Sequence, residues 1–401
     1  MMLKVVELKD AKKLISQRFS TYPFITVPLD ASAGRILAKD VYSPENLPRF
    51  LRSAMDGYAV KASCLSGASQ SVPVTFKLIG EAKMGQKTYI SLTDDGVVYV
   101  PTGAMLPEGA DAVVMIEHTS RLGDEIFVYS PVRWGENIIA KGEDYREGEL
   151  LLSRGSILTS AKIGVLAAAG VTEVPVVRPM KFSFISTGDE IIDIGETVDG
   201  GRIRDINSHL LKAMIKTLGE EVNSVIIKDD FNGLVAAIRK ALDASDVVVI
   251  SGGSSVGVRD YTKRAILEFT DDLFIEGIAL KPGKPTMAAS VGEKLVLGLP
   301  GNPMAASVAF DKVFIEGAFD AFGVKPPLRI HARAKINFPS ASGRATVMPL
   351  RLEATKDGYL ATPLFYKSGL IRMLSEADGY TIIDENEEGI PKGKLLEVYP
   401  L

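Results

Sequence analysis

The sequence has few of the residues that close disulfides or ligate zinc and iron. Among its 401 residues are one cysteine, Cys64, and three histidines, at positions 118, 209 and 331. One cysteine cannot form an intrachain disulfide, and the scattered histidines give neither a metal-ligand spacing nor a Ser-His-Asp triad. We therefore expect a reducing, cytoplasmic setting, and we interpret Cys64 as a small packing residue.

Long apolar runs and an excess of positive charge are also absent. The longest run of small apolar residues, 163–171, is interrupted by two glycines, and a membrane span needs about 18 residues. The first ten residues carry acids and lysines where a signal peptide has an apolar segment. With 46 basic against 50 acidic residues, the chain has no field that attracts a phosphate backbone. Neither a membrane nor a nucleic acid is an expected partner.

The composition itself is that of a folded chain with several domains. Hydrophobic residues make up 46% and charged residues 24% of the sequence, while 37 glycines and 21 prolines supply turns. This mixture excludes disorder along the whole chain, and the length suits two to four domains.

Between about residues 180 and 323, short β-branched runs alternate with longer amphipathic segments. This alternation is typical of a parallel sheet covered by helices, and it predicts a doubly wound α/β domain. Strands are expected at 181–186, 222–228, 246–251, 274–280, 286–290 and 294–299, with helices at 207–220, 231–242, 261–269 and from Pro303 onward.

The two flanking regions have a different pattern. After residue 326 the runs are short, alternating and bounded by turn residues, which predicts a small β-sandwich or barrel. Before residue 180 we expect helices near 9–19 and 160–169, with strands and turns between 60 and 155 forming one or two β-rich modules.

A glycine-rich segment, residues 250–263, follows the predicted strand at 246–251. Gly252, Gly253 and Ser254 stand where backbone N–H groups at the end of a parallel strand can bind an anion. The segment is neither a Walker P-loop nor a dinucleotide fingerprint, so a phosphate cradle of another kind is indicated. A turn without a ligand is the alternative.

Two further loops are expected at the same edge of the predicted sheet. One contains Lys281 and Lys284 around a Pro-Gly turn, and the other places Pro300, Gly301 and Asn302 before a helix. Positive charge and a helix N-terminus favour a phosphate or an oxyanion. Each loop alone also fits an ordinary turn, but three such loops at one edge indicate an anion site.

Carboxylates gather at this edge as well. Glu190 follows the first strand, and Asp205 and Asp260 lie in neighbouring loops. Carboxylates beside a phosphate site suggest Mg²⁺. The alternative for Asp205 is a helix cap, and Asp246, which opens a strand, is expected to be structural.

The N-terminal part contributes polar loops that composition alone does not distinguish from solvated turns. They contain the following residues: Arg49, Arg52, Ser53, Asp56, Thr102, Glu117, Lys141, Glu143 and Asp144.

Taken together, the motifs resemble the MoeA family, the molybdopterin molybdenumtransferases that include the E domain of gephyrin. The matching segments occur in the family's order: SAMDGYAV (53–60), PTGA (101–104), GEDYREGE (142–149), STGDE (186–190), SGGSSVGVRDY (251–261), KPGKP (281–285) and LPGNP (299–303). The resemblance implies an enzyme that binds adenylated molybdopterin, accepts molybdate or tungstate, and releases molybdenum cofactor and AMP in a Mg²⁺-dependent step.

The resemblance also implies an architecture. The fold would be a multidomain α/β protein with a central MogA-like doubly wound domain, β-rich N-terminal modules and a small C-terminal β-barrel. The implied domains are 1–45 with 145–178, 46–144 inserted between them, 179–325 and 326–401. An elongated homodimer is implied, with the active site shared between subunits, and so is a contact with molybdopterin adenylyltransferase.

Site residues carry over by their matching positions. The catalytic set is Asp56, Thr102, Asp144, Glu190 and Lys281; the substrate-binding set is Gly252, Gly253, Ser254, Lys284, Pro300, Gly301, Asn302, Pro303, Arg351 and Ser368; the metal set is Asp205, Asp260 and Glu190. In this scheme the glycine-rich loop holds the phosphate, Lys281 attracts molybdate, and Asp56 and Thr102 close the site from the partner subunit.

One departure and two alternatives remain. Where bacterial relatives are expected to carry another basic residue before KPGKP, this chain has Glu276 and Gly277. A molybdopterin adenylyltransferase would share the α/β domain, but the N-terminal and C-terminal modules argue against it. A scaffold that binds without turnover is the other alternative, and binding without AMP release would distinguish it.

Overall fold

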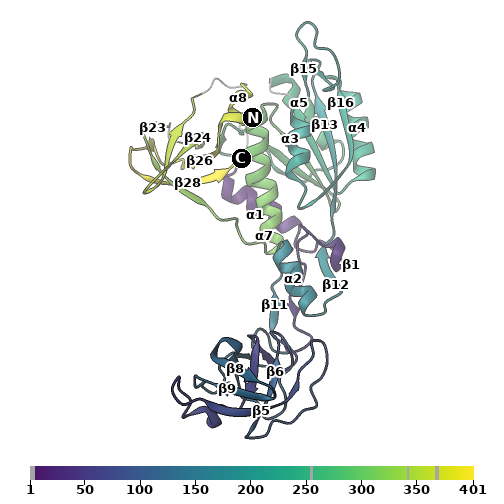
Figure 1. Cartoon of the computed structure of the whole chain (residues 1–401). Coiled ribbons are helices and arrows are strands. Elements are labelled where there is room, and N and C mark those ends of the chain that lie inside the picture. The colour runs from purple at the N-terminus through teal and green to yellow at the C-terminus, as the bar shows by residue number, and fades with distance from the viewer. Residues whose placement is uncertain (1–4, 253–255, 341–342, 366–369) are drawn as a thin grey trace.

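The structure is a computed structural model that describes residues 5–252, 256–340, 343–365 and 370–401, without the side chains of residues 256–260. The molecule is elongated (Figure 1). A β-rich module lies at one end, a narrow connection follows, and an α/β unit and a C-terminal barrel lie side by side at the other end. The positions of the candidate residues depend on this arrangement.

A six-stranded sheet forms the centre of the α/β unit. Its order is β16-β13-β17-β21-β20-β18, in which the first four strands are parallel and β20 and β18 are antiparallel. The strands are β13 (Met180–Thr187), β16 (Gly219–Ile227), β17 (Val247–Gly252), β18 (Leu273–Ile275), β20 (Met287–Val291) and β21 (Lys294–Leu299). The central strands are apolar on both faces because helices cover both.

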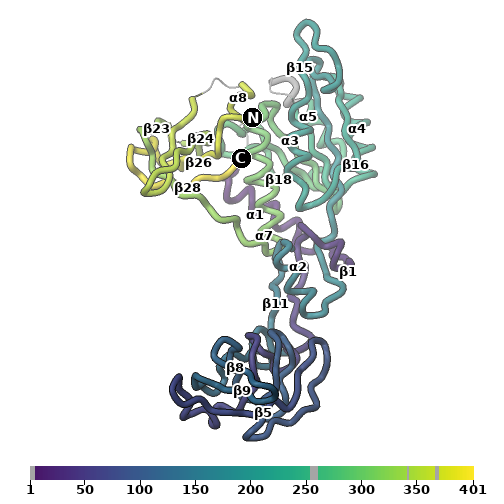
Figure 2. Tube along the Cα trace, in the orientation of Figure 1, coloured from purple at the N-terminus to yellow at the C-terminus, as the bar shows by residue number. Residues whose placement is uncertain are grey.

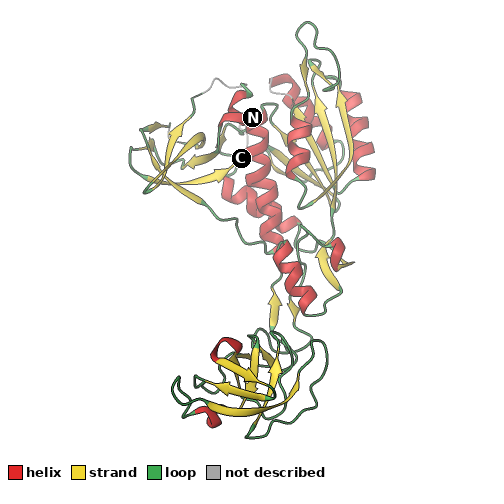
Figure 3. Ribbon diagram, in the orientation of Figure 1, coloured by secondary structure: helices red, strands yellow, loops and turns green. Residues whose placement is uncertain are grey.

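The covering helices pack in two layers (Figure 3). One layer is α4 (Phe231–Ala244) with α5 (Val256–Leu267), and the other is α1 (Leu8–Arg18), α3 (Asn207–Met214) and the continuous helix α6 (Pro303–Ala309), η4 (a π-helical turn, Phe310–Ile315) and α7 (Glu316–Phe322). None of the helices in the described part of the chain combines the length and the apolar character of a membrane span. Helices on both faces confirm the doubly wound α/β prediction.

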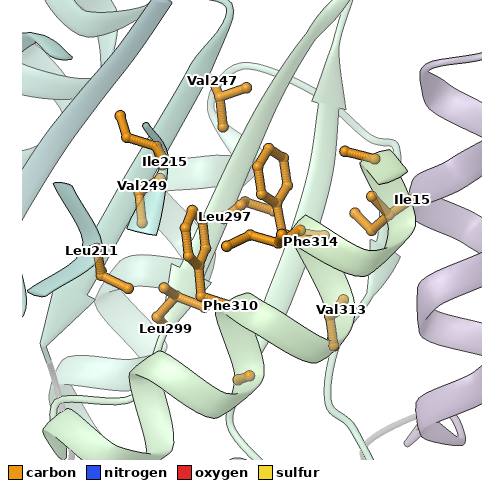
Figure 4. Close-up of a cluster of buried hydrophobic side chains, with 14 of the residues drawn as sticks. Ile15, Leu211, Ile215, Val247, Val249, Leu297, Leu299, Phe310, Val313 and Phe314 are labelled. Atoms are coloured by element: carbon orange, nitrogen blue, oxygen red, sulfur yellow. The ribbon is translucent and has the colours of Figure 1, made fainter. Parts of the chain in front are cut away.

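The largest core lies between the sheet and the long helix (Figure 4). The rings of Phe310 and Phe314 stack with centroids 5.0 Å apart. They belong to one buried cluster with Val249 and Leu297 of the sheet and Ile15 of α1. Burying one such aromatic ring contributes about 1.5–3 kcal/mol to stability. Because Ile15 belongs to this cluster, α1 is part of the α/β core, although it is far from the sheet strands in the sequence.

Two of the expected elements differ from the structure. The helix predicted at 207–220 ends at Met214, because the chain turns and β16 begins at Gly219. A Cβ at Gly219 would lie 1.9 Å from the carbonyl oxygen of Met180, so β16 starts in direct backbone contact with β13. The strand predicted at 274–280 is divided into β18 and the short β19 (Leu280–Lys281). Between them the chain leaves the sheet and forms a bridge from Ile278 to Val6.

The module at the far end is built on a six-stranded sheet of order β7-β4-β6-β5-β9-β8. Its strands are β4 (Gly57–Val60), β5 (Val74–Glu81), β6 (Gly96–Val100), β7 (Ala112–Met115), β8 (Thr119–Leu122) and β9 (Glu125–Val128), with short turns η2 (Ala62–Leu65) and η3 (Ile116–His118). Two apolar clusters pack against this sheet, one around Tyr58 and Val114 and the other around Val98 and Val113. We call residues 46–144 the distal module.

The connection consists of strand pairs that are far apart in sequence, as the tube in Figure 2 shows. The pairs are β1 (Phe24–Pro28) with β12 (Glu173–Val177) and β2 (Val41–Tyr42) with β11 (Leu150–Leu152). Within the distal module, β3 (Arg52–Ser53) pairs with β10 (Ile138–Ile139) next to this connection. The turn η1 (Leu29–Ala31) and helix α2 (Ser160–Ala168) complete it. The chain thus enters and leaves the distal module side by side.

The C-terminal region forms a closed five-stranded barrel, in agreement with the prediction. Its strands pair in the cycle β24-β25-β22-β28-β26 and back to β24, and β19 adds to the outside of β24. The elements are β22 (Ile330–Ala334), β24 (Ala345–Thr355), β25 (Gly358–Pro363), α8 (Arg372–Glu376), β26 (Gly379–Ile383) and β28 (Leu395–Pro400), with β23 (Phe338–Pro339) paired to β27 (Gly389–Ile390).

Asp246 joins three segments, which confirms its expected structural role. Its carboxylate accepts two hydrogen bonds from Arg178, at 2.8 and 3.1 Å, and one of 2.8 Å from the backbone N–H of Lys181. The hydroxyl of Tyr22 donates to it at 3.4 Å. Burial raises the pKa of Asp246, but these hydrogen bonds lower it more, so the net pKa is below the ordinary value.

We predict that Asp246→Ala lowers the free energy of unfolding by about 1–3 kcal/mol, because Arg178 and Lys181 lose a charged acceptor. A lowered folded-state pKa gives stability that is full above about pH 5 and is lost as the pH falls through the folded pKa. The difference between the variant and the unmodified chain should therefore shrink in acid. Urea unfolding at several pH values measures it.

The control is Asp243→Ala, at an exposed position three residues earlier. This change should alter the free energy of unfolding by less than about 0.5 kcal/mol. Equal effects of the two variants would contradict the role of Asp246.

Candidate functional site

The carboxyl ends of the parallel strands meet at one edge of the sheet. Thr187 of β13 lies opposite Gly252 of β17, and Ser251 of β17 lies opposite Leu299 of β21. The antiparallel β20 starts at this same edge with Met287. The glycine-rich loop and the two other predicted loops therefore start or end side by side, as the sequence predicted, and we call this the carboxyl edge.

Gly252 brings two strands into close contact at this edge. Its φ is +138°, and a Cβ there would lie 2.3 Å from both the carbonyl oxygen and the Oγ1 of Thr187. Only glycine fits without displacing β13. Gly253 and Ser254, the next predicted phosphate-binding residues, lie outside the described residues, so the anion cradle stays a prediction.

Three carboxylates lie together at the ends of β13 and β16. The backbone N–H of Asp229 donates to Oδ1 of Asp189 at 3.2 Å. Burial and the negative charges of Asp189 and Glu190 raise the pKa of Asp229. The Oδ1 atom of Asp229 is buried and has no hydrogen-bond partner. We call Asp189, Glu190 and Asp229 the acidic group.

Sequence reasoning selected Glu190 but missed Asp229. The available signal was its position two residues after β16, because the carboxyl ends of parallel strands share one edge. The prediction included this strand but no contact between the carboxylates that follow it and the STGDE segment. The close approach of Asp229 to Asp189 then follows from the parallel pairing of β16 with β13.

Asp205 is held more tightly than a free metal ligand would be. It is 5% exposed, and its Oδ2 accepts a hydrogen bond of 2.7 Å from the hydroxyl of Ser186. Its Oδ1 accepts one of 3.2 Å from the backbone N–H of Ser208 in the first turn of α3. This is the helix-capping alternative, so both oxygens already have donors. A role of Asp205 as a metal ligand stays a prediction.

The described carboxylates do not complete a metal site by themselves. Within the parts of the chain that are described, no group of three or more His, Cys, Asp or Glu residues is arranged to hold a metal ion. Asp260 belongs to α5, and its side chain lies outside the described residues.

Lys281 lies in a cleft between the α/β unit and the barrel. The cleft has a volume of about 600 Å³, and Lys281, Asn302 and Met304 form its α/β wall. Residues 346–349 of β24 and Phe365 are among those that form the barrel wall. Lys281 is exposed and pairs through β19 with Thr346 of β24. We call this space the barrel cleft.

The loop 300–303 closes the α/β side of the barrel cleft. Asn302 caps α6 by accepting a hydrogen bond of 3.1 Å from the backbone N–H of Ala305, and Pro303 occupies the first helical position. The carbonyl of Gly301 accepts a hydrogen bond of 3.0 Å from Asn207 of α3. Pro300 and Gly301 are thus held between β21 and α3.

Glu276 and Gly277, which stand where another basic residue was expected, are both held by contacts within the chain. The backbone N–H of Val6 donates to the carbonyl of Gly277 at 2.9 Å, and a Cβ at Gly277 would lie 3.2 Å from the carbonyl oxygen of Lys284. Glu276 forms an ion pair with Lys263 of α5. Lys284 itself is half-buried, and its carbonyl accepts from the backbone N–H of Ile278 at 3.1 Å.

Asp56 and Thr102 form an exposed pair on the distal module. Oδ1 of Asp56 accepts hydrogen bonds from the backbone N–H of Thr102, at 2.6 Å, and from its hydroxyl, at 2.8 Å. These two bonds lower the pKa of Asp56. The carboxylate is therefore fixed in place and kept charged, although it faces solvent.

Two other predicted residues lie in charged pairs. Asp144 is exposed, and its Oδ2 lies 3.8 Å from Nη2 of Arg52. Arg351, on β24 of the barrel, donates to Oε2 of Glu376 at 2.8 Å. Ser368 lies outside the described residues.

The structure does not bring all the predicted residues together within one chain. Asp56, Thr102 and Asp144 belong to the distal module, while Glu190, Gly252 and Lys281 lie at the opposite end of the molecule (Figure 1). The carboxyl edge and the barrel cleft therefore form one candidate site, and the Asp56–Thr102 pair forms another surface.

Comparison with known proteins matches nearly the whole chain to one family. The MoeA N-terminal region (domain I and II) matches residues 6–170, a probable molybdopterin binding domain matches 183–318, and the MoeA C-terminal region (domain IV) matches 331–401. The molybdopterin molybdenumtransferase of Staphylococcus aureus strain COL is 31% identical over 98% of this chain and 95% of its own length. The chain belongs to the MoeA family.

Solved structures give the same relationship for the MoeA fold. A crystal structure of the MoeA molybdopterin biosynthesis protein of Pyrococcus horikoshii OT3 superposes with a TM-score of 0.84 at 28% identity, covering 99% of this chain and 100% of that one. Another Pyrococcus MoeA structure gives 0.82 at 36% identity, with 99% of both chains covered. The predicted fold class, a multidomain α/β protein with a central MogA-like domain, is therefore confirmed for this MoeA-family chain.

We predict that Thr102→Ala raises the pKa of Asp56 toward the ordinary value, because the carboxylate loses the hydroxyl donor and keeps only the backbone N–H. Carboxyl-carbon NMR titration of the Asp56 resonance measures the shift. Thr102→Ser, which keeps a hydroxyl, should leave the pKa low. An unchanged pKa in Thr102→Ala would show that the hydroxyl does not stabilise the charged form.

Proposed function

We propose that this MoeA-family chain inserts molybdate or tungstate into adenylated molybdopterin, releasing molybdenum cofactor and AMP in a Mg²⁺-dependent step. The observation that supports this most is the presence at one sheet edge of the acidic group and of the barrel cleft, which Lys281 lines. Such a site offers ligands for a cation beside a phosphate and a positive charge for an oxyanion. Membership of the MoeA family supports a molybdopterin substrate.

The acidic group offers some of the oxygen ligands that a divalent cation needs. The buried Oδ1 of Asp229 has no donor, and burial together with the like charge of its neighbours Asp189 and Glu190 raises the pKa of Asp229. Oxygen ligands that repel one another in this way are stabilised by a hard cation such as Mg²⁺. The acidic group would hold the ion together with substrate phosphate, because the protein supplies too few ligands alone. Bound Mg²⁺ would neutralise the charge that develops on the phosphate.

The chain's own groups bind and orient the substrate. Gly252 lets the end of β17 approach the phosphate closely, and Pro300–Pro303 shape the adjoining wall. In the barrel cleft, the Lys281 ammonium attracts the doubly negative oxyanion and places it near the dithiolate. A volume of about 600 Å³ leaves room for a pterin beside a tetrahedral oxyanion.

The separated distal module supports a homodimer with shared sites. Two hydrogen bonds hold the Asp56 carboxylate in place, although it faces solvent. The carboxyl edge of the same chain lies at the other end of the molecule. In a two-fold dimer, this surface of one subunit would cover the carboxyl edge of the other. Asp56, Thr102 and Asp144 would then complete the site and exclude water.

The first test is AMP release from adenylated molybdopterin by the purified chain. We expect release that requires Mg²⁺ and either molybdate or tungstate, and the relative rates give the metal preference. Asp229→Asn should slow AMP release by about 100-fold at low Mg²⁺, because several kcal/mol of charge stabilisation depend on the metal.

Asp271→Asn is the matched control, since Asp271 is exposed and precedes β18, whose pairing with β20 puts it at the other edge of the sheet. This variant should behave as the unmodified chain does. Tight binding of the adenylated pterin without any AMP release would overturn the proposed reaction in favour of a binding protein.

The shared site is tested by mixing two inactive variants, Asp56→Ala and Lys281→Ala. If sites form between subunits, random exchange leaves about one quarter of the sites with both native residues. AMP release should therefore return to roughly one quarter of the unmodified rate after subunit exchange. If the site lies within one chain, the mixture stays as inactive as the separate variants.

A further inference from the structure

A lysine is buried in the middle of the long helix that joins the two walls of the barrel cleft. Lys312 lies in the π-helical turn η4 and is 3% exposed. Its ammonium is 3.1 Å from the carboxylate of Asp311 and 2.8 Å from that of Glu316. Burying a charge is costly unless it is paired and hydrogen-bonded, so such a position calls for an explanation.

The charged pairs of Lys312 belong to the helix, while its aromatic partners belong to the barrel. The ammonium lies 3.6 Å from the ring centroid of Tyr399 on β28 and 5.4 Å from that of Tyr380 on β26. The two rings stack with centroids 5.3 Å apart. A desolvated cation over such rings is attracted by the negative charge of their faces.

Two more contacts connect the same surfaces. The hydroxyl of Tyr380 donates to Oδ2 of Asp311 at 2.9 Å. Arg329, which precedes β22, bonds Glu316 at 3.3 Å, and its guanidinium lies 4.3 Å from the ring centroid of Tyr399. Lys312 is therefore the centre of a joint between helix and barrel.

The π-helical turn sets which way Lys312 points. Phe310 and Phe314, on either side of it, pack into the core of the sheet (Figure 4). A residue midway between two such positions lies on the opposite face of the helix. The helix thus presents aromatic rings to the sheet and an ammonium to the barrel.

This joint is continuous with the barrel cleft on both sides. Tyr380 of β26 is the direct partner of Pro349 on β24, and residues 346–349 of β24 line the cleft. At the start of the same helix, Met304 and the capping residue Asn302 line the opposite wall. A change at the joint would therefore be transmitted to β24 through its pairing with β26.

We propose that Lys312 is a positioning residue that fixes the C-terminal barrel on helix α6–η4–α7 and so sets the width of the barrel cleft for the oxyanion. The inference rests on the proposed function for its substrate. Among the described residues, no contact joins Lys312 to Lys281 or to Asn302. Lys312 therefore acts through the rings of Tyr380 and Tyr399, and through the pairing of Tyr380 with Pro349 of β24.

The test compares Lys312→Met with Lys12→Met. Lys12 of α1 binds the same Glu316 and also Asp320, so its loss removes a lysine from Glu316 without removing a contact to the barrel rings. AMP release is measured as a function of molybdate concentration. A small displacement of a binding wall costs about tenfold or more, and we expect the KM for molybdate to rise by that factor in Lys312→Met.

The maximal rate at saturating molybdate should stay within about twofold, because the phosphate-binding edge is unchanged. Lys12→Met should keep the KM. A Lys312→Met variant with the same KM as Lys12→Met, or one that loses maximal rate alone, overturns the proposal.

Tyr380→Phe provides a second variant if Lys312→Met does not fold. It keeps the ring and removes only the hydrogen bond to Asp311, so a smaller rise in the KM, in the same direction, is expected. An unchanged KM would count against the joint.

A separate readout keeps this inference distinct from the proposed function. Hydrogen exchange of the β24 and β19 amides should become faster in Lys312→Met than in Lys12→Met, whatever the substrate is. If the unmodified chain releases no AMP but this difference is seen, the reaction is wrong and the positioning role stands. If AMP is released normally and exchange is unaltered, the positioning role is wrong.

Discussion

The contact between the helix α6–η4–α7 and the central sheet is the interaction on which the other parts depend. Phe310 and Phe314 fill the space between helix and sheet, and α1 closes the same core with Ile15. The N-terminus of this helix, capped by Asn302, lies at the carboxyl edge. Lys312, in its middle, contacts Tyr380 and Tyr399 of the barrel. Loss of this packing would therefore separate the walls of the candidate site as well as lower stability.

The negative and the positive side chains of the candidate site lie at different strands of the sheet. Asp189, Glu190 and Asp229 follow β13 and β16, whereas Lys281 and Lys284 lie beyond β21, next to β20 and the barrel. The glycine-rich end of β17 lies between the two groups, so a substrate that spans the edge would meet carboxylates, backbone N–H groups and then ammonium groups. This order matches a substrate with a phosphate near its centre and an oxyanion acceptor at one end.

Local sequence patterns were sufficient for most of the α/β elements, because buried strands such as 246–251 are β-branched and the helices are amphipathic. They placed Glu190 and Asn302 at one edge, since both follow parallel strands. Lys281 reaches the same edge because it precedes the antiparallel β20, which starts there. The local patterns contain a signal for Asp229, which is its position after β16, but none for Lys312, whose contacts come from residues distant in sequence. The division of the predicted strand at 274–280 has the same cause, because Val6 pairs with Ile278.

The insertion of the distal module has a consequence for the order of folding during synthesis. β1 and β2 pair with β12 and β11, which are synthesised only after residues 46–144. At about 5–20 residues per second, the early strands wait roughly 10–30 s for their partners. The distal sheet has all its strands within one continuous segment, so it can close first. Its completion would then bring Leu47 beside Tyr145 and hold the two halves of the connection together.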